Sequence, residues 1–343
     1  MLLECVPNFS EGCDQQKLNQ IATSIRSVPG ISFLGMDSSR AANRTVMTFA
    51  GPPESVLEAA FRAIRTAAET IDMRQQKGVH PRIGATDVCP LIPLRGLTTQ
   101  DAVLYARELA QRVGKELGIP VYLYAHSAED LHRIRLSDIR RGGYEALAER
   151  MQLAEHFPDF GPRSFQPKVG ATVIGARDLM IAYNMNLENG SLALAKKIAA
   201  HIREQQKPCS DRKKSQGFKG LRAIGWYLEA QNLTQVSTNI MDLSATAIHE
   251  VFERVQFLAG IAGARVSGSE IIGLIPRQPL QDAGSFFLDK WNQSKLDPVE
   301  AAIEGLALNS NKPFNPATHV LENALHLGQN LPITASSRSQ FQS

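Results

Sequence analysis

The chain has 343 residues, enough for two ordinary hydrophobic cores, because domains cluster at about 100–200 residues. Its 43% hydrophobic and 21% charged content is that of a globular protein, and no run approaches the ~18 consecutive apolar residues that would indicate a membrane span. A net charge of +3 is too small to indicate nucleic-acid binding by itself.

The first residues, 1–7, lack the basic segment and the long apolar stretch of a secretion signal, so the expected location is the cytoplasm. Cys5, Cys13, Cys89 and Cys209 lie far apart without CxxC spacing. This spacing favours reduced thiols over disulfides or a zinc site, and we expect no metal.

The first half of the chain alternates strand and helix patterns. Residues 2–9 are predicted to form a strand, 14–27 a helix that ends near Gly30, and 31–37 and 44–50 two more strands. Pro53 begins a helix that reaches about Met73, and 83–94 is an extended run. The order β-α-β-β-α-β is that of the ferredoxin-like fold. A helix at 99–117, a strand at 120–125 and a polar, partly helical segment at 126–151 are predicted to extend it.

The second half repeats this order. Its predicted elements are a strand at 177–187, a helix at 191–203, strands at 221–228 and 233–241, a helix at 244–259 and a strand at 266–275. The predicted fold is α+β, with two ferredoxin-like subdomains at 1–176 and 177–331 and mixed or antiparallel sheets. A basic segment at 207–222 is expected to be a mobile loop, and the Ser/Gln-rich residues 332–343 a disordered tail.

The most unusual segment is KGVHPRIGATDVCP, residues 77–90. A histidine exchanges protons near neutral pH, and an arginine two positions on can hold a carboxylate, so His80 and Arg82 are candidate site residues. In an extended stretch both side chains point to the same side. The same string also fits a surface loop in which His80 is solvated and Arg82 pairs with Asp87. No second ligand stands at the helical zinc spacing from His80.

Two other segments could bind ligands. In residues 159–172, Phe160 and Phe165 offer flat apolar faces, and backbone amides near Gly161 and Gly170 could bind the polar edge of a heterocycle. The same residues would also suit a plain interdomain linker with aromatic anchors. Residues 10–12 open a helix whose N-terminus could face a substrate carboxylate or could simply be capped.

Five strings carry a family resemblance: CVPNFSEG at 5–12, NRTV at 43–46, HPRIGATDVCP at 80–90, GATVIGAR at 170–177 and QVSTN at 235–239. In this order they resemble the glutamate formiminotransferase (formimidoyltransferase) family over residues 3–276. The resemblance implies two ferredoxin-like subdomains with a substrate tunnel between them and a homodimer. Larger animal members carry a fused cyclodeaminase domain, which we expect this chain to lack.

The resemblance also implies the reaction. A formimino group passes from N-formimino-L-glutamate to tetrahydrofolate, giving 5-formiminotetrahydrofolate and L-glutamate in histidine degradation, with tetrahydrofolate as co-substrate. His80 matches the catalytic acid/base of the family. We further expect Asp37 to orient His80, and Arg44 and Arg82 to hold glutamate carboxylates.

The remaining expected substrate-binding positions are Asn8 and the segment that matches the family's folate-binding loop. That loop consists of Gly161, Pro162, Arg163, Ser164, Phe165, Gln166, Pro167, Lys168, Val169 and Gly170. Lys168 could meet the folate glutamate tail or face water.

Three rival functions remain open. The first is transfer of a formyl group between 5-formyltetrahydrofolate and glutamate. The formyl and formimino groups differ by one atom, oxygen against nitrogen, so the pocket composition cannot separate them. A folate-binding protein without catalysis is a second rival, and a ferredoxin-like nucleic-acid binder using the basic loop is a third. The nucleic-acid reading is disfavoured by an aromatic content of 6% and by the absence of an RNP-like string, so we expect no nucleic-acid or membrane partner.

Overall fold

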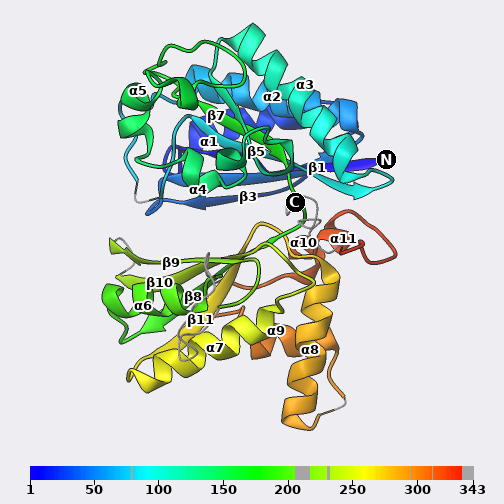
Figure 1. The fold of residues 1–343 in the computed structure, drawn as a ribbon. Coiled ribbons are helices and arrows are strands. Elements are labelled where there is room, and N and C mark those ends of the chain that lie inside the picture. The colour runs from blue at the N-terminus through cyan, green and yellow to red at the C-terminus, as the bar shows by residue number, and fades with distance from the viewer. Residues whose placement is uncertain (79, 205–216, 230–231, 294, 311, 334–343) are drawn as a thin grey trace. The chain divides into compact units, whose positions relative to one another are not determined.

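A computed structural model describes residues 1–78, 80–204, 217–229, 232–293, 295–310 and 312–333. The chain forms two compact units, Met1–Arg177 and Asp178–Ser343 (Figure 1). Within the described ranges, no helix combines the length and the apolar character needed to cross a membrane. Residues 207–216 of the predicted basic loop at 207–222 lie outside the described residues. Residues 334–343 of the predicted tail at 332–343 lie outside them as well.

The first unit contains the predicted β-α-β-β-α-β order. Its elements are β1 (Leu2–Cys5), β2 (Asn8–Phe9), α1 (Gln15–Arg26), β3 (Ser32–Ser39), β4 (Arg44–Gly51), α2 (Pro53–Thr70) and β5 (Thr86–Arg95). Both β1 and β2 pair antiparallel with β4 on one side and β5 on the other, and β3 pairs with β4. The predicted strand at 2–9 is therefore two short strands, interrupted beside Pro7, which has no N–H for the ladder.

The sheet continues beyond β5. The helix α3 (Thr99–Leu117) leads to β6 (Val121–Leu123), and β7 (Thr172–Ala176) lies between β5 and β6, parallel to both. The predicted strand at 177–187 is wrong in its first part, because β7 ends at Ala176 and the next strand begins at Ile181. All five residues of β7 are buried, so the strand shows no alternation of polar and apolar residues that would reveal it.

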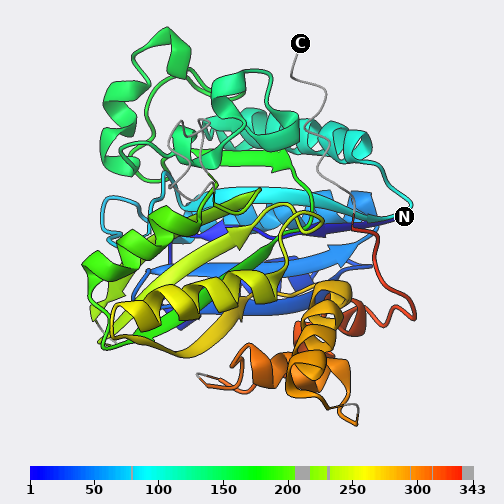
Figure 2. The ribbon, with the colours of Figure 1, turned by 60° about the horizontal axis from the view of Figure 1, so that its bottom comes forward.

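Both faces of β5, β7 and β6 are covered, by α1, α2 and α3 on one side and by residues 131–151 on the other (Figures 1 and 2). Cys89 and Ile174 pack in the same core as the apolar side chains of the three helices, whereas Val88 and Val173 belong to the cluster on the opposite face. On that face they share a cluster with Ile139 and neighbouring apolar side chains of residues 131–151. Short turns of helix lie in this segment and on either side of it: η1 (Ala125–Ser127), η2 (Leu131–Arg133), α4 (Leu136–Ile139), η3 (Tyr144–Ala146), α5 (Leu147–Arg150) and η4 (Ala154–His156). The packing of these apolar side chains places Arg140 of the same segment at Asp87, near the start of β5.

The second unit repeats the same order. Its elements are β8 (Ile181–Glu188), α6 (Leu192–Ile202), β9 (Leu221–Leu228), β10 (Leu233–Ile240), α7 (Ile248–Ile261) and β11 (Arg265–Ile272). The sheet order is β11-β8-β10-β9, with every pair antiparallel, as in the first four-stranded frame. Four helices that the sequence does not predict follow: α8 (Arg277–Trp291), α9 (Pro298–Gly305), α10 (Pro316–His319) and α11 (Leu321–Ala324).

Candidate active site

His80 lies in the connection between α2 and β5 and is partly buried. Its Nδ1 stands 2.8 Å from the carbonyl oxygen of Pro81. Because a carbonyl only accepts, this contact favours the tautomer with the proton on Nδ1. In the neutral ring the lone pair then sits on Nε2, which is the atom that would take up a proton.

A fully buried carboxylate lies close to His80. Asp87, the second residue of β5, accepts hydrogen bonds from Arg44 Nη1 at 2.5 Å, from Arg140 Nε at 3.2 Å and from the amide of Ile83 at 3.0 Å. Arg140 Nη2 also donates to it. Burial by itself would raise the pKa of Asp87, but the charges of Arg140 and Arg44 outweigh it and lower the pKa to about 2. The carboxylate is therefore ionised throughout the neutral range.

The cluster of Arg44, Asp87 and Arg140 carries one more positive than negative charge. Burial lowers the pKa of Arg44 to about 10, although Asp87 opposes this shift, so Arg44 stays charged near pH 7. Its Nε donates to Asn8 Oδ1 at 3.1 Å. Among the described residues, Nη2 of Arg44 and Nη1 of Arg140 have no hydrogen-bond acceptor. The cluster can thus attract and bind a further anionic group.

This charge also acts on His80. Burial lowers the pKa of His80 well below its usual value, and the positive charges of Arg44 and Arg140 lower it further, while Asp87 partly opposes them. His80 is therefore a neutral imidazole at pH 7, which can accept a proton.

Arg82 is not paired with Asp87, so that sequence-based alternative is wrong. Its Nη2 donates to the carbonyl oxygen of Gln76 at 2.7 Å and to Glu145 at 3.0 Å. Its Nε is buried and finds no partner in the described part of the chain. Most of the Arg82 guanidinium is thus engaged within the protein, and its expected contact with a substrate carboxylate stays a prediction.

The expected folate loop, residues 161–170, packs directly on the segment that follows His80. The amide of Ala85 donates to Val169 O at 2.8 Å, and the amide of Ala171 donates to Ile83 O at 3.0 Å. Gly170 has a left-handed φ of 69°, and a Cβ there would lie 2.1 Å from Ile83 O. The amide of Gly170 itself donates to Gln166 O. The amides at 170 and 171 are therefore occupied and are not available to a heterocycle, contrary to expectation.

Several side chains of this loop also have partners within the first unit. Phe165 lies 5.5 Å from the ring of Tyr144, whose hydroxyl donates to Pro167 O. Lys168 donates through Nζ to the carbonyl oxygen of Glu69 at 2.9 Å, and the guanidinium of Arg163 lies 4.6 Å from the ring centre of Phe157. The loop is thus tied to α2 and to the 131–151 segment.

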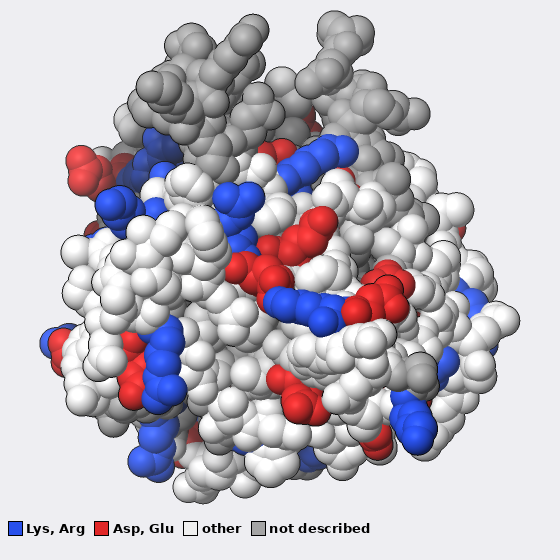
Figure 3. Space-filling view, turned by 90° about the horizontal axis from the view of Figure 1, so that it is seen from below, with Lys and Arg blue, Asp and Glu red and all other residues white. Residues whose placement is uncertain are grey.

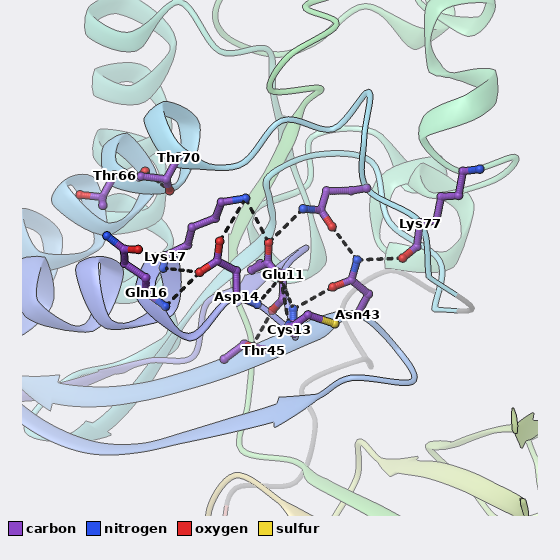
Figure 4. A network of polar contacts seen from close by, with 12 residues as sticks. Glu11, Cys13, Asp14, Gln16, Lys17, Asn43, Thr45, Thr66, Thr70 and Lys77 are labelled. Atoms are coloured by element: carbon purple, nitrogen blue, oxygen red, sulfur yellow. Dashed lines mark hydrogen bonds and ion pairs between the residues drawn. The ribbon is translucent and has the colours of Figure 1, made fainter. Parts of the chain in front are cut away.

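The N-terminus of α1 does not present open amides to a substrate. The Glu11 carboxylate accepts hydrogen bonds from the amides of Gly12, Cys13 and Asp14 at 3.1, 2.9 and 3.0 Å (Figure 4). These amides lead into α1, and the first amides of the helix itself, those of Gln16 and Lys17, donate to the side chain of the N-cap residue Asp14. The start of α1 is therefore capped by the chain's own carboxylates, which is the capping alternative for this segment.

Sequence reasoning missed the partners that residues 131–151 contribute. Arg140 stands 53 residues from Asp87, and Glu145 stands 63 residues from Arg82, and no local pattern links such pairs. Asp37, the expected partner of His80, lies partly buried in β3 with Val46 opposite it in the sheet. Whether it orients His80 stays a prediction.

Charges elsewhere are mixed. On the face seen in Figure 3, the described Lys and Arg side chains are interspersed with Asp and Glu and form no continuous basic patch. The described residues also contain no group of three or more His, Cys, Asp or Glu side chains placed to hold a metal ion.

The two βαββαβ units and a histidine set beside buried guanidinium groups define an α+β protein with a candidate proton-transfer site. Comparison with protein families gives matches over both units. Residues 2–177 match the formiminotransferase domain, N-terminal subdomain, and residues 182–326 match the formiminotransferase domain. The chain belongs to the formiminotransferase family.

Individual relatives agree with this assignment. A formimidoyltransferase-cyclodeaminase of Mus musculus is 45% identical over 326 residues, which is 94% of this chain and 59% of the relative. A glutamate formimidoyltransferase of Streptococcus pyogenes serotype M1 is 38% identical over 84% of this chain and 93% of the relative. That of Thermoplasma acidophilum is 41% identical over 84% and 92%. The chain thus spans 59% of the mouse relative's length and almost all of the two shorter ones.

Proposed function

We propose that this protein transfers a formimino group from N-formimino-L-glutamate to tetrahydrofolate, with His80 as general acid and base. The observation that carries the proposal is a neutral imidazole held beside a cluster with excess positive charge. Membership of the formiminotransferase family supplies the reaction class.

In the proposed reaction, His80 Nε2 accepts the proton of folate N5 while the bond from N5 to the formimino carbon forms. The tetrahedral intermediate then collapses. The bond from that carbon to the glutamate nitrogen breaks, and His80 returns the proton to the departing amine. The imidazole is unchanged after one cycle, as a single acid/base residue requires.

Arg44 and Arg140 are proposed to hold a glutamate carboxylate through the nitrogens that Asp87 and Asn8 do not occupy. Asp87 fixes both guanidinium groups in place, since it bonds to each of them. A carboxylate bound here would balance the extra positive charge. Asp37 and Arg82 are proposed to support His80, without themselves exchanging the proton.

The pterin of tetrahydrofolate is proposed to lie against the 161–170 loop. The support for this is the loop's tie to Ile83 and Ala85, close to His80 in the chain, and the flat face of Phe165. The substrate tunnel and the homodimer implied by the resemblance stay predictions, as does the cytoplasmic location expected from the first residues.

The formyl alternative requires a direct comparison of donors. Purified protein is incubated with N-formimino-L-glutamate and tetrahydrofolate, and separately with 5-formyltetrahydrofolate and L-glutamate, while the folate absorbance is followed. The proposal expects turnover in the first reaction at a kcat/KM well above that in the second. Turnover only with the formyl donor would replace the formimino assignment, and tight folate binding without turnover in either would leave a folate-binding protein.

A further inference from the structure

Gln76 sits four positions before His80 and joins three parts of the first unit. Its side-chain Nε2 donates to Glu11 Oε2 at 3.0 Å, and its Oε1 accepts from Asn43 Nδ2 at 2.5 Å. Its backbone carbonyl accepts from Arg82 Nη2 at 2.7 Å. The junction before α1, the turn between β3 and β4, and the segment after His80 thus all meet at one residue.

The direction of every hydrogen bond in this network is fixed at its ends. At one end Glu11 Oε1 accepts from the amides at positions 12–14, which can only donate. At the other end Asn43 Nδ2 donates to the carbonyl of Lys77 at 2.8 Å, and Asn43 Oδ1 accepts from the amide of Gly12 at 2.9 Å (Figure 4). A backbone N–H can only donate and a backbone carbonyl can only accept. Flipping the side-chain amide of Gln76 or Asn43 would therefore place two donors or two acceptors against each other elsewhere in the network.

The network holds the chain on both sides of His80. Before it, Gln76 and Lys77 are bound by side chains, and Gly78 packs so closely on the backbone that a Cβ there would lie 2.4 Å from Ala42 O. After it, Arg82 returns to the Gln76 carbonyl. Glu11 is almost fully buried, so water competes poorly for these bonds.

We propose that Gln76 is a positioning residue for His80, and that Glu11 and Asn43 act on His80 through it. The contacts of Gln76 are with Glu11, Asn43 and Arg82, and the proposal gives it no contact with either substrate. Gln76 fixes the backbone from which the imidazole projects, and a misplacement of about 1 Å at a reacting group can cost about 10²-fold in rate. The role of the positioned imidazole rests on the proposed function, whereas the positioning itself does not.

The polarity of the network gives a reciprocal test. Glu11→Gln sets an NH2 group against the NH2 of Gln76, and Gln76→Glu sets one carboxylate against another. The double variant Glu11→Gln/Gln76→Glu restores a donor–acceptor match along the hydrogen bonds that join positions 11, 76 and 43, and it keeps the net charge. Lys17, which lies 3.6 Å from Glu11 Oε2, keeps its ion pair with Asp14. Gln75→Glu is the matched control, because it makes the same chemical change one residue away, on an exposed side chain outside the network.

Two measurements are made on each full-length variant: kcat and KM for formimino transfer, and the titration of the His80 ring by NMR. Both single variants are expected to lower kcat by about 10²-fold with little change in KM. They should also move the His80 pKa up toward its usual value, as the ring becomes more exposed to water and moves away from Arg44 and Arg140. The double variant should recover both quantities, and Gln75→Glu should resemble the wild type.

Wild-type kcat and His80 titration in both single variants would overturn the proposal, as would a double variant no better than the worse single one. Circular dichroism checks folding. If Gln76→Glu fails to fold, Gln76→Ala removes the side chain without adding a like charge, and it is read in the same way. If the wild-type protein shows no formimino transfer at all, the proposed function fails, but the His80 titrations still decide whether Gln76 positions the ring.

Discussion

In the first unit, β5 is followed in the sheet by the parallel strands β7 and β6, whereas in the second unit the corresponding strand, β11, forms the sheet edge. The two four-stranded frames otherwise share one strand order. The extra strands of the first unit provide an apolar surface, and residues 131–151 pack on it. That packing brings Arg140 to Asp87.

The polar groups of the two sheets differ in the same way. In the first unit a buried carboxylate bonds to two guanidinium groups. In the second unit the buried Gln235 donates to Asn186 at 2.7 Å and to Glu270 at 3.0 Å, and it accepts from Trp226 at 2.9 Å. This cluster is built mostly from neutral amides. The two units share one order of strands and helices, yet their buried polar groups differ. The difference arises because residues 131–151, which only the first unit has, supply the second positive charge, that of Arg140.

The largest expected effect is that of Asp87→Asn. The substitution keeps the shape of the side chain but leaves Arg44 and Arg140 side by side without a counter-ion, which should cost about 3–5 kcal/mol in the free energy of unfolding. Both tryptophans, Trp226 and Trp291, lie in the second unit, so fluorescence does not report the loss. Amide hydrogen exchange of β5 in the full chain measures it.

The matched control is Asp289→Asn on α8, because Asp289 is exposed and its carboxylate forms no ion pair or hydrogen bond in the described part of the chain. Equal protection of β5 in the two variants would show that the Arg44–Asp87–Arg140 cluster does not stabilise the first unit.

A smaller loss is expected for Gln235→Leu in the second unit. The side chain makes three hydrogen bonds to largely neutral groups, and their unsatisfied partners should cost about 1–3 kcal/mol. Urea unfolding followed by tryptophan fluorescence measures this unit directly. The exposed Gln256→Leu on α7 is the control. A loss greater than that of Asp87→Asn would reverse the comparison between the charged cluster of the first unit and the mainly amide cluster of the second.

The smallest effect is a shift in pH dependence. Arg140→Gln removes one of the two positive charges that, after burial, lower the pKa of His80. The His80 pKa should therefore rise, and the acidic limb of kcat/KM should move to higher pH, because more of the imidazole is protonated at a given acidic pH. Arg141→Gln, one residue on and mostly exposed, should leave the limb in place. If the acidic limb of kcat/KM stays in place in Arg140→Gln, the charge of the Arg44–Asp87–Arg140 cluster does not act on the group that titrates there.

Where signals were local, the sequence predicted structure well. The helix at 99–117 is bounded by a Thr98–Asp101 capping box and by Gly118 in a left-handed conformation, and both are readable from adjacent residues. The predicted β-α-β-β-α-β order is present once in each unit. In contrast, β7 escaped prediction because a strand buried on both faces carries no alternating pattern.

The site was predicted less completely. The segment at 77–90 contains His80 and Asp87, but the partners of Asp87 are set by tertiary packing: Arg44 lies 43 residues earlier and Arg140 53 residues later. Arg82, the nearest candidate in sequence, bonds instead to Gln76 and Glu145. The carboxylate of the N-cap residue Asp14 likewise stands at the start of α1 in place of an expected substrate, because a helix N-terminus predicts an anion without specifying its source.

The central claim is that His80 carries the proton between the two amines. The most direct test is kcat for formimino transfer by His80→Ala, with the dissociation constant for tetrahydrofolate measured on the same sample. Loss of a general acid/base should lower kcat by about 10²–10⁴-fold while folate affinity is retained. A folded His80→Ala protein with wild-type kcat would contradict the claim.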